Sequence, residues 1–400
     1  MKELCISIDV SKGESHVGSF IDPMTIHRKV FVIKHDLRGF QKIKVLQHEM
    51  KEKYEKDVYV VFEATGVYHR GLQNYLEQNN IPYHMISPLL SARFRKQSLR
   101  SIKTDKADCT TIAKVYYNCE LNDSHRAEDT YYSLQQMSRH YESLLGHLRK
   151  CKVSMNEILE IVFPGYDSFF SNLYSDISLA IIKKYPHPEM IENKKAETIT
   201  AYLKKHTKHR ENWIKSKTIA VIDLARNTIS GCRVDDVNVL ILKSAIEQVE
   251  YYENLVKVTL ERMIDLAQEM PNYLVLLSIP GIGENLAARI LAEIGDIERF
   301  RGPKQLIAYT GIEPIIYQSG KNDGYHYRIS KRGNKRLRTL LYTAVKCMIR
   351  KTTKETSIKK YYHKKTQQEN PMNSNAAVIA SANKLLRVIY GMCKTGCIYQ

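Results

Sequence analysis

The spacing of apolar residues changes near residue 120 of this 400-residue chain, and that change limits the folds available to it. Before it, short apolar runs have the continuous or alternating pattern of β-strands, at 4–10, 15–21, 29–33, 58–63 and 82–86. Helical spacing lies between and after these runs, at 37–54, 68–79 and 105–119. The order βββαβαβα predicts an α/β domain with a mixed sheet.

Beyond this domain the pattern is helical. Apolar residues recur every three or four positions through 134–158 and 237–266, which predicts two long helices pairing as an antiparallel coiled coil. Helix-breaking Pro and Gly residues and a basic stretch at 204–210 lie between these two helices. The simplest interpretation of this middle region is a helical spacer. Further helices are expected at 335–350 and 375–394, so we expect domains at 1–122, 123–274 and 275–400.

The charge of the chain indicates its class of partner. Lys and Arg number 61 against 43 Asp and Glu, which gives a formal net charge of +18. Such an excess favours a polyanionic partner, above all nucleic acid. No uncharged apolar run approaches the roughly 18 residues that span a bilayer, and the eight cysteines show no paired CxxC spacing. We therefore expect a cytoplasmic protein without a membrane partner, associated with the nucleoid when bound to DNA.

Four carboxylates occupy positions typical of a metal-dependent nuclease. Asp9 ends the first strand and Glu63 ends the central strand, while Asp105 and Asp108 lie one turn apart at a helix start. Two-metal phosphodiester chemistry needs such a cluster of oxygen ligands. Each residue alone has an ordinary explanation, since strand-terminal Asp is common and Asp105 could complement a helix dipole. The combination predicts a metal site.

Glycines and basic residues in the C-terminal region indicate contact with phosphates. Gly281 and Gly283 precede an apolar helix, which favours a helix-hairpin-helix whose backbone N–H groups face a phosphate; an ordinary αα-hairpin with glycine caps is the alternative. A dense basic cluster follows, which predicts a phosphate clamp unless it is only a solvated face. Its members are Lys321, Arg328, Lys331, Arg332, Lys335, Arg336 and Arg338. A second basic group leads into the Asp105 helix: Arg93, Arg95, Lys96, Arg100 and Lys103.

Ser319 stands between Gln318 and Gly320, just before the basic cluster. A serine in such a loop is ordinarily a turn residue. Beside guanidinium groups it could also act as a nucleophile in phosphoryl transfer. Spacing alone leaves both interpretations open.

Five separated segments, in order, resemble the IS110 family of insertion-sequence transposases, also called DEDD transposases. They are Ile8-Asp9-Val10-Ser11-Lys12, Phe62-Glu63-Ala64-Thr65-Gly66-Val67-Tyr68, Lys103-Thr104-Asp105-Lys106-Ala107-Asp108, Ile279-Pro280-Gly281-Ile282-Gly283 and Ile329-Ser330-Lys331-Arg332-Gly333-Asn334. The closing helix, 377–390, is also similar. The resemblance covers about residues 4–120 and 275–397. The middle region and the C-terminal tail are longer than in the compact members of the family, with an insert at about 160–235.

The resemblance implies a RuvC-like N-terminal domain of ribonuclease H fold in which Asp9, Glu63, Asp105 and Asp108 bind Mg²⁺. It implies that Ser319 is the nucleophile, which forms a 5′-phosphoserine with DNA in a centre composed across subunits. Ser330 then has a structural or phosphate-contacting role. The family further implies double-stranded target and donor DNA, a non-coding bridge RNA, and dimers that join into a tetramer.

Two alternatives remain at this stage. A RuvC-like junction nuclease would hydrolyse DNA with activated water and leave Ser319 unused. A structural nucleic-acid-binding protein would carry the four carboxylates by coincidence.

Overall fold

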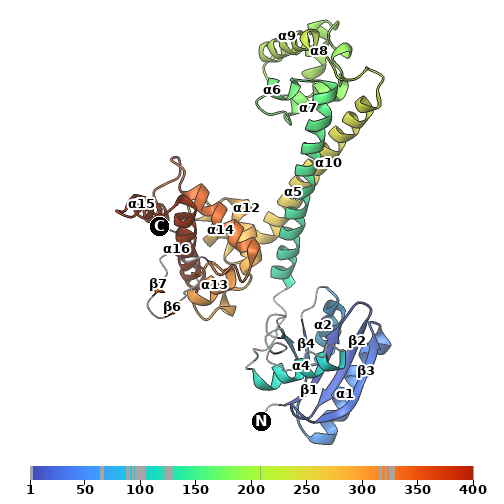
Figure 1. Cartoon of the computed structure of the whole chain (residues 1–400), viewed down its shortest axis with the longest axis vertical. Coiled ribbons are helices and arrows are strands. Elements are labelled where there is room, and N and C mark those ends of the chain that lie inside the picture. Colours follow the sequence, from blue (N-terminus) through green and yellow to red (C-terminus); the bar gives the residue numbers. More distant parts are fainter. Residues whose placement is uncertain are drawn as a thin grey trace. The chain divides into compact units, whose positions relative to one another are not determined.

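The structure is a computed structural model, in which the chain divides into two units, Met1–Arg126 and Ala127–Gln400 (Figure 1). It describes residues 3–63, 67–86, 91, 94, 105–119, 121, 129–207, 209–314, 318–319, 322–323 and 329–399. For residues 105–107, 129, 318–319 and 322–323 the backbone alone is described.

A five-stranded mixed sheet forms the centre of the first unit. Its strands, in spatial order, are β3 (Ile26–Lys34), β2 (Glu14–Phe20), β1 (Leu4–Val10), β4 (Val58–Glu63) and β5 (Tyr83–Ile86). The first three strands form an antiparallel meander, because short turns connect them. The pairs β1–β4 and β4–β5 are parallel. The mixed sheet predicted from the apolar runs is thus confirmed.

Helices cover both faces of this sheet. Alternate residues of β1 and β4, such as Ile8 and Phe62, pack in one core with α1 (Leu37–Tyr54) and α2 (His69–Gln78). The intervening residues, such as Cys5 and Val61, pack in a second core with α4 (Asp105–Asn118). Both strands are buried on each side, which explains why their sequences read as continuous apolar runs.

Two long helices dominate the middle of the second unit. Helix α5 (Asp129–Val162) and helix α10 (Val237–Gln268) lie side by side (Figure 1). They run antiparallel, since Leu134 near the start of α5 shares a core with Met263 near the end of α10. Lys152 of α5 also pairs with Glu253 of α10, with 2.6 Å between Nζ and Oε1. A coiled-coil geometry for this pair stays a prediction.

The insert between the long helices packs with the adjoining ends of α5 and α10 around one core, which includes the fully buried Phe163 and Tyr166. Gly231 N donates to Ile161 O at 2.8 Å, so the chain re-enters next to the point where it left α5. Its elements are α6 (Tyr166–Phe169), α7 (Asp176–Lys184), η1 (Pro188–Met190), α8 (Ala196–Leu203) and α9 (Glu211–Asn227).

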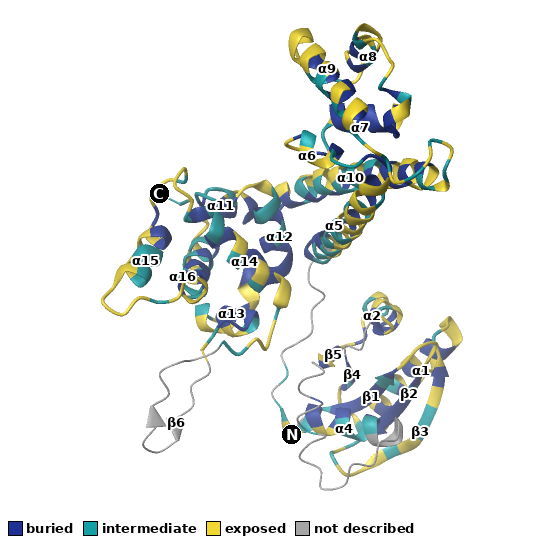
Figure 2. Ribbon diagram, turned by 45° about the horizontal axis from the view of Figure 1, so that its top comes forward, coloured by how far each residue is buried: buried dark blue, intermediate teal, exposed yellow. Residues whose placement is uncertain are grey.

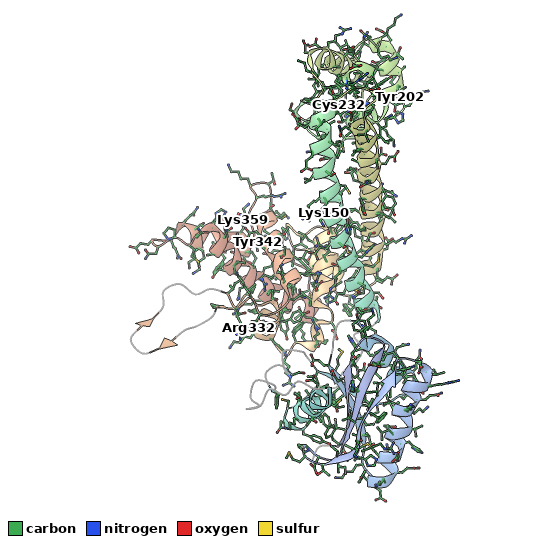
Figure 3. The ribbon with its side chains drawn as sticks, turned by 45° about the vertical axis from the view of Figure 1, so that its right-hand side comes forward. Lys150, Tyr202, Cys232, Arg332, Tyr342 and Lys359 are labelled. Atoms are coloured by element: carbon green, nitrogen blue, oxygen red, sulfur yellow. The ribbon has the colours of Figure 1, made fainter. Side chains whose placement is uncertain are left out.

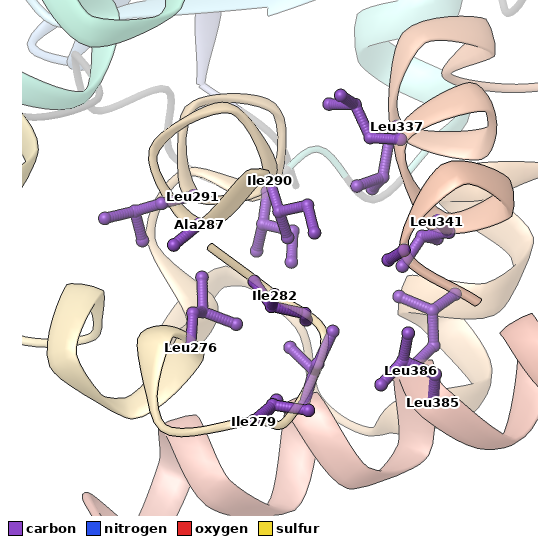
Figure 4. Packing of buried hydrophobic residues seen from close by; sticks show 14 of the residues in the cluster. Leu276, Ile279, Ile282, Ala287, Ile290, Leu291, Leu337, Leu341, Leu385 and Leu386 are labelled. Carbon is purple, nitrogen blue, oxygen red and sulfur yellow. The ribbon is translucent and has the colours of Figure 1, made fainter. Parts of the chain in front are cut away.

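In the C-terminal part, helices pack around another core of the second unit, in which Ile282, Ile290, Leu341 and Leu386 meet (Figure 4). Its elements are α11 (Tyr273–Leu277), α12 (Glu284–Ile294), η2 (Ile297–Arg299), α13 (Pro303–Thr310), β6 (Gln318–Ser319), β7 (Asn322–Asp323), α14 (Lys335–Met348), α15 (Ser357–Gln367) and α16 (Ser374–Thr395). The expected helical remainder is confirmed. Helices α11, α13 and α15 and the helices of the insert were not predicted individually.

Among the described residues, α16 is the one helix long and apolar enough to cross a membrane. Within that stretch 44% of the residues are buried. Leu385, Leu386 and Ile389 lie in the C-terminal core, so the apolar face of α16 is occupied by its own domain.

Candidate functional site

Asp9 and Glu63 come together through strand pairing. The parallel register of β1 and β4 places Ile8 opposite Phe62, so the next residues, Asp9 and Glu63, lie side by side at the same edge of the sheet. Side chains alternate between the two faces along a strand, so Asp9 lies on the same face as Cys5, and Glu63 on the same face as Val61. Cys5 and Val61 face α4. The Glu63 side chain is buried, and Asp9 is half-buried.

Helix α4, which carries Asp108, packs on the same face of the sheet as Cys5 and Val61. It approaches β1 and β2 closely at Gly18, where a Cβ atom would lie 3.2 Å from Cβ of Cys109. Cys109 Sγ donates to His16 O at 3.3 Å and holds the helix against β2. Burial raises the pKa of the Cys109 thiol to about 12, and the negative charges of Asp9 and Asp108 act on it in the same direction.

The fourth predicted ligand, Asp105, is the first residue of α4, one helical turn before Asp108. Its side chain lies outside the described residues. Among the side chains that the structure does describe, no group of three or more His, Cys, Asp and Glu is close enough to hold a metal ion. The donor chemistry of Asp9, Glu63 and Asp108 nevertheless fits a hard divalent cation, because all three offer carboxylate oxygens.

Ser319 lies in β6, whose two residues pair with β7 through Gln318–Asp323 and Ser319–Asn322. The short hairpin belongs to the second unit and the carboxylates to the first. The Ser319 side chain falls outside the described part of the chain. So do Lys321, Arg328 and the whole upstream group: Arg93, Arg95, Lys96, Arg100 and Lys103.

The segment 329–334 is held to α13 by its backbone. Asn334 N donates to Tyr309 O at 2.7 Å, and Lys331 N donates to Gly311 O at 3.0 Å. Gly333 has φ +134°, and a Cβ there would lie 2.3 Å from Tyr309 O, so only glycine fits. The motif therefore has a structural explanation, independent of phosphate binding.

The predicted phosphate clamp divides into two groups. Arg336 pairs with Glu142 of α5, with 2.7 Å between Nε and Oε2, and Arg338 donates to Thr310 O at 2.9 Å. These two guanidinium groups already have partners within the chain. Lys331, Arg332 and Lys335 are exposed, and Figure 3 shows Arg332 at the surface.

Gly281 and Gly283 differ in their surroundings. Gly281 has φ +94°, and its Cβ would lie 2.8 Å from Cγ of Met348, so the turn before α12 packs tightly on α14. Gly283 is the N-cap of α12, and a Cβ there would meet nothing within 4 Å. Gly281 thus has a packing role, whereas Gly283 leaves the N-terminus of α12 open.

A buried carboxylate next to this region was missed in the sequence. Glu293 of α12 is fully buried, and Arg139 Nε of α5 lies 3.3 Å from its Oε1. Asn334 Nδ2 donates to Glu293 Oε2 at 2.7 Å. Arg139, Glu293 and the Asn334 amide thus connect α5, α12 and the start of α14. The only sequence indication was a glutamate within an otherwise apolar helix, which does not identify distant partners.

Two family models match the chain. A transposase model for the DEDD domain of IS110 elements matches residues 6–164, and a model described as the transposase IS116/IS110/IS902 family matches residues 273–363. The chain belongs to the IS116/IS110/IS902 family of transposases. The family assigns the first unit to its DEDD domain of ribonuclease H-like fold, which implies use of a divalent metal ion. Residues 165–272 lie outside both matches.

Individual relatives agree with this family assignment. The transposase for insertion sequence element IS1111A of Coxiella burnetii is 36% identical over 29% of this chain and 31% of its own length. A 44.8 kDa protein of insertion element IS116 from Streptomyces clavuligerus is 20% identical over 73% of this chain and 71% of its own. The pilin gene-inverting protein of Moraxella bovis is 26% identical over 49% and 56%. The chain thus spans about a third of the IS1111A transposase.

Proposed function

We propose that this chain is the transposase of an insertion sequence and moves that element by cutting and rejoining DNA strands. The observation that carries the proposal is the meeting of Asp9 and Glu63 at one sheet edge, with α4, which carries Asp108, packed on the same face of the sheet. The matches to both family domains support it. The names of two relatives, a transposase and a gene-inverting protein, favour recombination over hydrolysis.

Asp9, Glu63, Asp105 and Asp108 are the residues that would hold Mg²⁺. The metal would supply positive charge at the phosphate under attack. The part of the protein is to fix the ligands: β1 and β4 set the spacing of two carboxylates, and α4 adds two more from one turn of helix. A buried sheet edge excludes water from part of this ligand set, which strengthens its electrostatic interactions.

Ser319 is the nucleophile in this proposal. Its hydroxyl oxygen attacks a DNA phosphorus, its proton passes to solvent, and the bond from phosphorus to the 3′ oxygen breaks. The 3′ oxygen leaves as a hydroxyl and the 5′ end stays on the serine as a phosphodiester. Attack by the 3′ hydroxyl of another strand then restores the serine and joins the exchanged strands. Exposed Lys331, Arg332 and Lys335 would neutralise the phosphates nearby.

The remaining expectations concern partners and assembly. A bridge RNA would pair with target and donor DNA, and the open N-terminus of α12 at Gly283 would contact a phosphate as part of a helix-hairpin-helix. The α5–α10 pair would act as a coiled coil that joins copies into dimers and then a tetramer. All of this would take place in the cytoplasm, at the nucleoid.

Ser319→Ala tests the chemistry, with Ser374→Ala as the control, an exposed serine of the same unit at the start of α16. Recombination between donor and target DNA, with the co-purified RNA and Mg²⁺, should be lost in Ser319→Ala and kept in Ser374→Ala. A protein–DNA adduct resistant to denaturant should form with the wild type and disappear in Ser319→Ala.

Two results would contradict parts of the proposal. An adduct that persists in Ser319→Ala would exclude this serine as the nucleophile. Cleavage without an adduct, unchanged in Ser319→Ala and lost in Asp9→Asn, would instead identify a metal-dependent junction nuclease.

A further inference from the structure

The turn between α8 and α9 carries a basic surface that the proposed chemistry does not use. Residues 204–210 read Lys-Lys-His-Thr-Lys-His-Arg, and Glu211 is the one acidic residue in the sequence from 204 to 217. Lys205, His206, His209 and Arg210 are exposed. Lys204 pairs with Glu211, with 2.6 Å between Nζ and Oε2, which leaves a clear excess of positive charge.

An exposed aromatic cluster lies on one side of this turn. Trp213 on α9 is 39% exposed, and its ring centroid lies 4.1 Å from that of His209. Nζ of Lys217, one helical turn further, lies 6.0 Å from the Trp213 ring and 4.9 Å from the Phe169 ring. A second cation–aromatic pair lies nearby: Nζ of Lys184, the last residue of α7, lies 3.8 Å from the ring of Tyr202 on α8. Figure 3 labels Tyr202.

The core of the insert does not require Trp213. On α9 the buried residues are Ile214, Thr218, Val221, Ile222 and Ala225, and Trp213 is not among them. Much of the remaining surface of α9 is exposed (Figure 2). Large aromatic side chains are normally placed where they bury area. An exposed tryptophan among cations therefore suggests a ligand with a flat ring and negative charge.

Unpaired nucleotides have both properties. Their bases stack on aromatic side chains, and their phosphates bind Lys and Arg, so grooves that combine the two side-chain types bind single strands. In a duplex the bases stack on each other and offer no free face to a side chain. A second copy of the same basic surface would bring like charges together, which disfavours self-association here.

We propose that the α8–α9 surface binds a single-stranded segment of nucleic acid, with an unpaired base against Trp213 and its phosphates at Lys205, Arg210 and Lys217. The proposal goes beyond the strand-transfer function and does not depend on it. The surface lies within residues 165–272, outside both family matches.

Trp213 is the only tryptophan in the chain, so its fluorescence reports this surface alone. The full-length protein is titrated with a twelve-nucleotide oligo(U), the matching oligo(dT) and a twelve-base-pair duplex, in EDTA to prevent cleavage. We expect both single strands to quench the fluorescence and the duplex to have little effect. The two midpoints then show whether RNA or DNA binds more tightly.

Two variants on α9 keep Trp213 as the fluorescent reporter, and they distinguish the loss of a neighbouring charge from a change elsewhere on the helix. Lys217→Met removes a charge and keeps an apolar stem, so the quenching midpoint should rise roughly five- to tenfold and the slope of log affinity against log salt should fall by about 0.7. Ile219→Ala truncates another exposed side chain of α9, and its midpoint should match the wild type.

Three outcomes would overturn the proposal. One is unchanged Trp213 fluorescence while labelled oligonucleotide is saturated by anisotropy, which would place binding elsewhere on the chain. Another is a fluorescence change with protein concentration alone, which would show that a second copy covers the surface. The third is an equal midpoint in Lys217→Met and the wild type.

Discussion

At the scale of single residues, Gly18 controls how closely α4 approaches the sheet that carries Asp9. A Cβ at this position would lie 2.8 Å from Cε2 of Phe20 and 3.2 Å from Cβ of Cys109. Gly18→Ala should therefore push α4 outward, lower the free energy of unfolding by roughly 1–3 kcal/mol, and displace Asp108. We expect strand cleavage to fall about tenfold, since small misplacements of catalytic groups are costly. Thermal unfolding and a cleavage assay measure the two effects.

Gly71→Ala is the matched control for Gly18→Ala. Gly71 lies in α2 of the same unit, and its Cβ would lie 3.8 Å from the Phe40 ring, an ordinary contact. Alanine also favours a helix over glycine by about 1 kcal/mol. The control should be as stable as the wild type or more so, and equally active. Equal activity in Gly18→Ala would show that the close approach of α4 does not matter for cleavage.

Asn334 offers a second test, because it caps α14 and also contacts a buried carboxylate. Its side chain accepts from Leu337 N at 3.0 Å and donates to Glu293 at 2.7 Å. Asn334→Ser keeps a capping oxygen and should lower the free energy of unfolding by about 1 kcal/mol. Asn334→Asp also keeps a good cap, but it places a second carboxylate beside Glu293. It should therefore lower the free energy of unfolding by about 2 kcal/mol more than Asn334→Ser does.

Urea unfolding of the two Asn334 variants measures this difference. If the serine and aspartate variants are equally stable, capping decides the role of Asn334 and the Glu293 contact contributes little.

What could be predicted at this scale depends on how far apart the partners are in sequence. Asp9 and Glu63 were predictable because each ends an apolar strand, and parallel strands place such residues at one edge. The Arg139–Glu293 pair was not, since its members lie 154 residues apart on helices whose packing the local pattern does not show. Arg336 and Arg338 appeared as clamp residues for the same reason: their partners, Glu142 and Thr310, lie elsewhere in the chain.

At the scale of elements, the last turn of α16 carries one thiol, and a second thiol follows the helix. Burial raises the pKa of the Cys393 thiol to about 12, while Cys397, just after the helix, is exposed. Iodoacetamide at pH 8 should alkylate Cys397 and leave Cys393 unmodified in the folded protein, as peptide mass spectrometry can show. Native Cys393 that reacts as fast as Cys397 would mean that the end of α16 does not stay packed in the C-terminal core.

The same thiol links stability to pH. The pKa of Cys393 in the folded protein lies above the value of about 8.5 in the unfolded chain. The contribution of this thiol to the free energy of unfolding is therefore fully present below about pH 8.5 and is lost as the pH rises toward 12. Above pH 9, unfolding should become easier by up to about 1.4 kcal/mol per pH unit from this group. Cys393→Ala should show a smaller drop in urea midpoint between pH 8 and pH 10.5 than the wild type.

The elements themselves were largely predictable. The five strands and the helices α1, α5, α10, α14 and α16 follow from periods of two or 3.6 residues that tertiary packing does not override. Helices α13 and α15 are short and mostly polar on their outer faces, so their periodicity is weak. They form because the C-terminal core buries Leu306 and Ile358, a tertiary effect that a local pattern does not contain.

At the scale of the whole molecule, the proposed catalytic residues are divided between two units: the carboxylates lie in Met1–Arg126 and Ser319 in Ala127–Gln400. A working centre needs one of each, and they can come from the same chain or from two chains. Mixed oligomers of Asp9→Asn and Ser319→Ala distinguish these arrangements, since neither variant alone can complete a centre.

If each centre takes its carboxylates from one subunit and its serine from another, a mixed dimer contains one intact centre and one doubly defective centre. Co-expression should then restore strand transfer to a substantial fraction of the wild-type level. If both groups come from the same chain, every centre in the mixture lacks one of them and activity stays absent. Single-variant preparations at the same total concentration are the controls. The two co-expressed genes are sequenced to check that recombination between them has not restored a wild-type copy. Restoration would identify the oligomer, rather than the chain, as the catalytic unit, because charge and nucleophile then meet only on assembly.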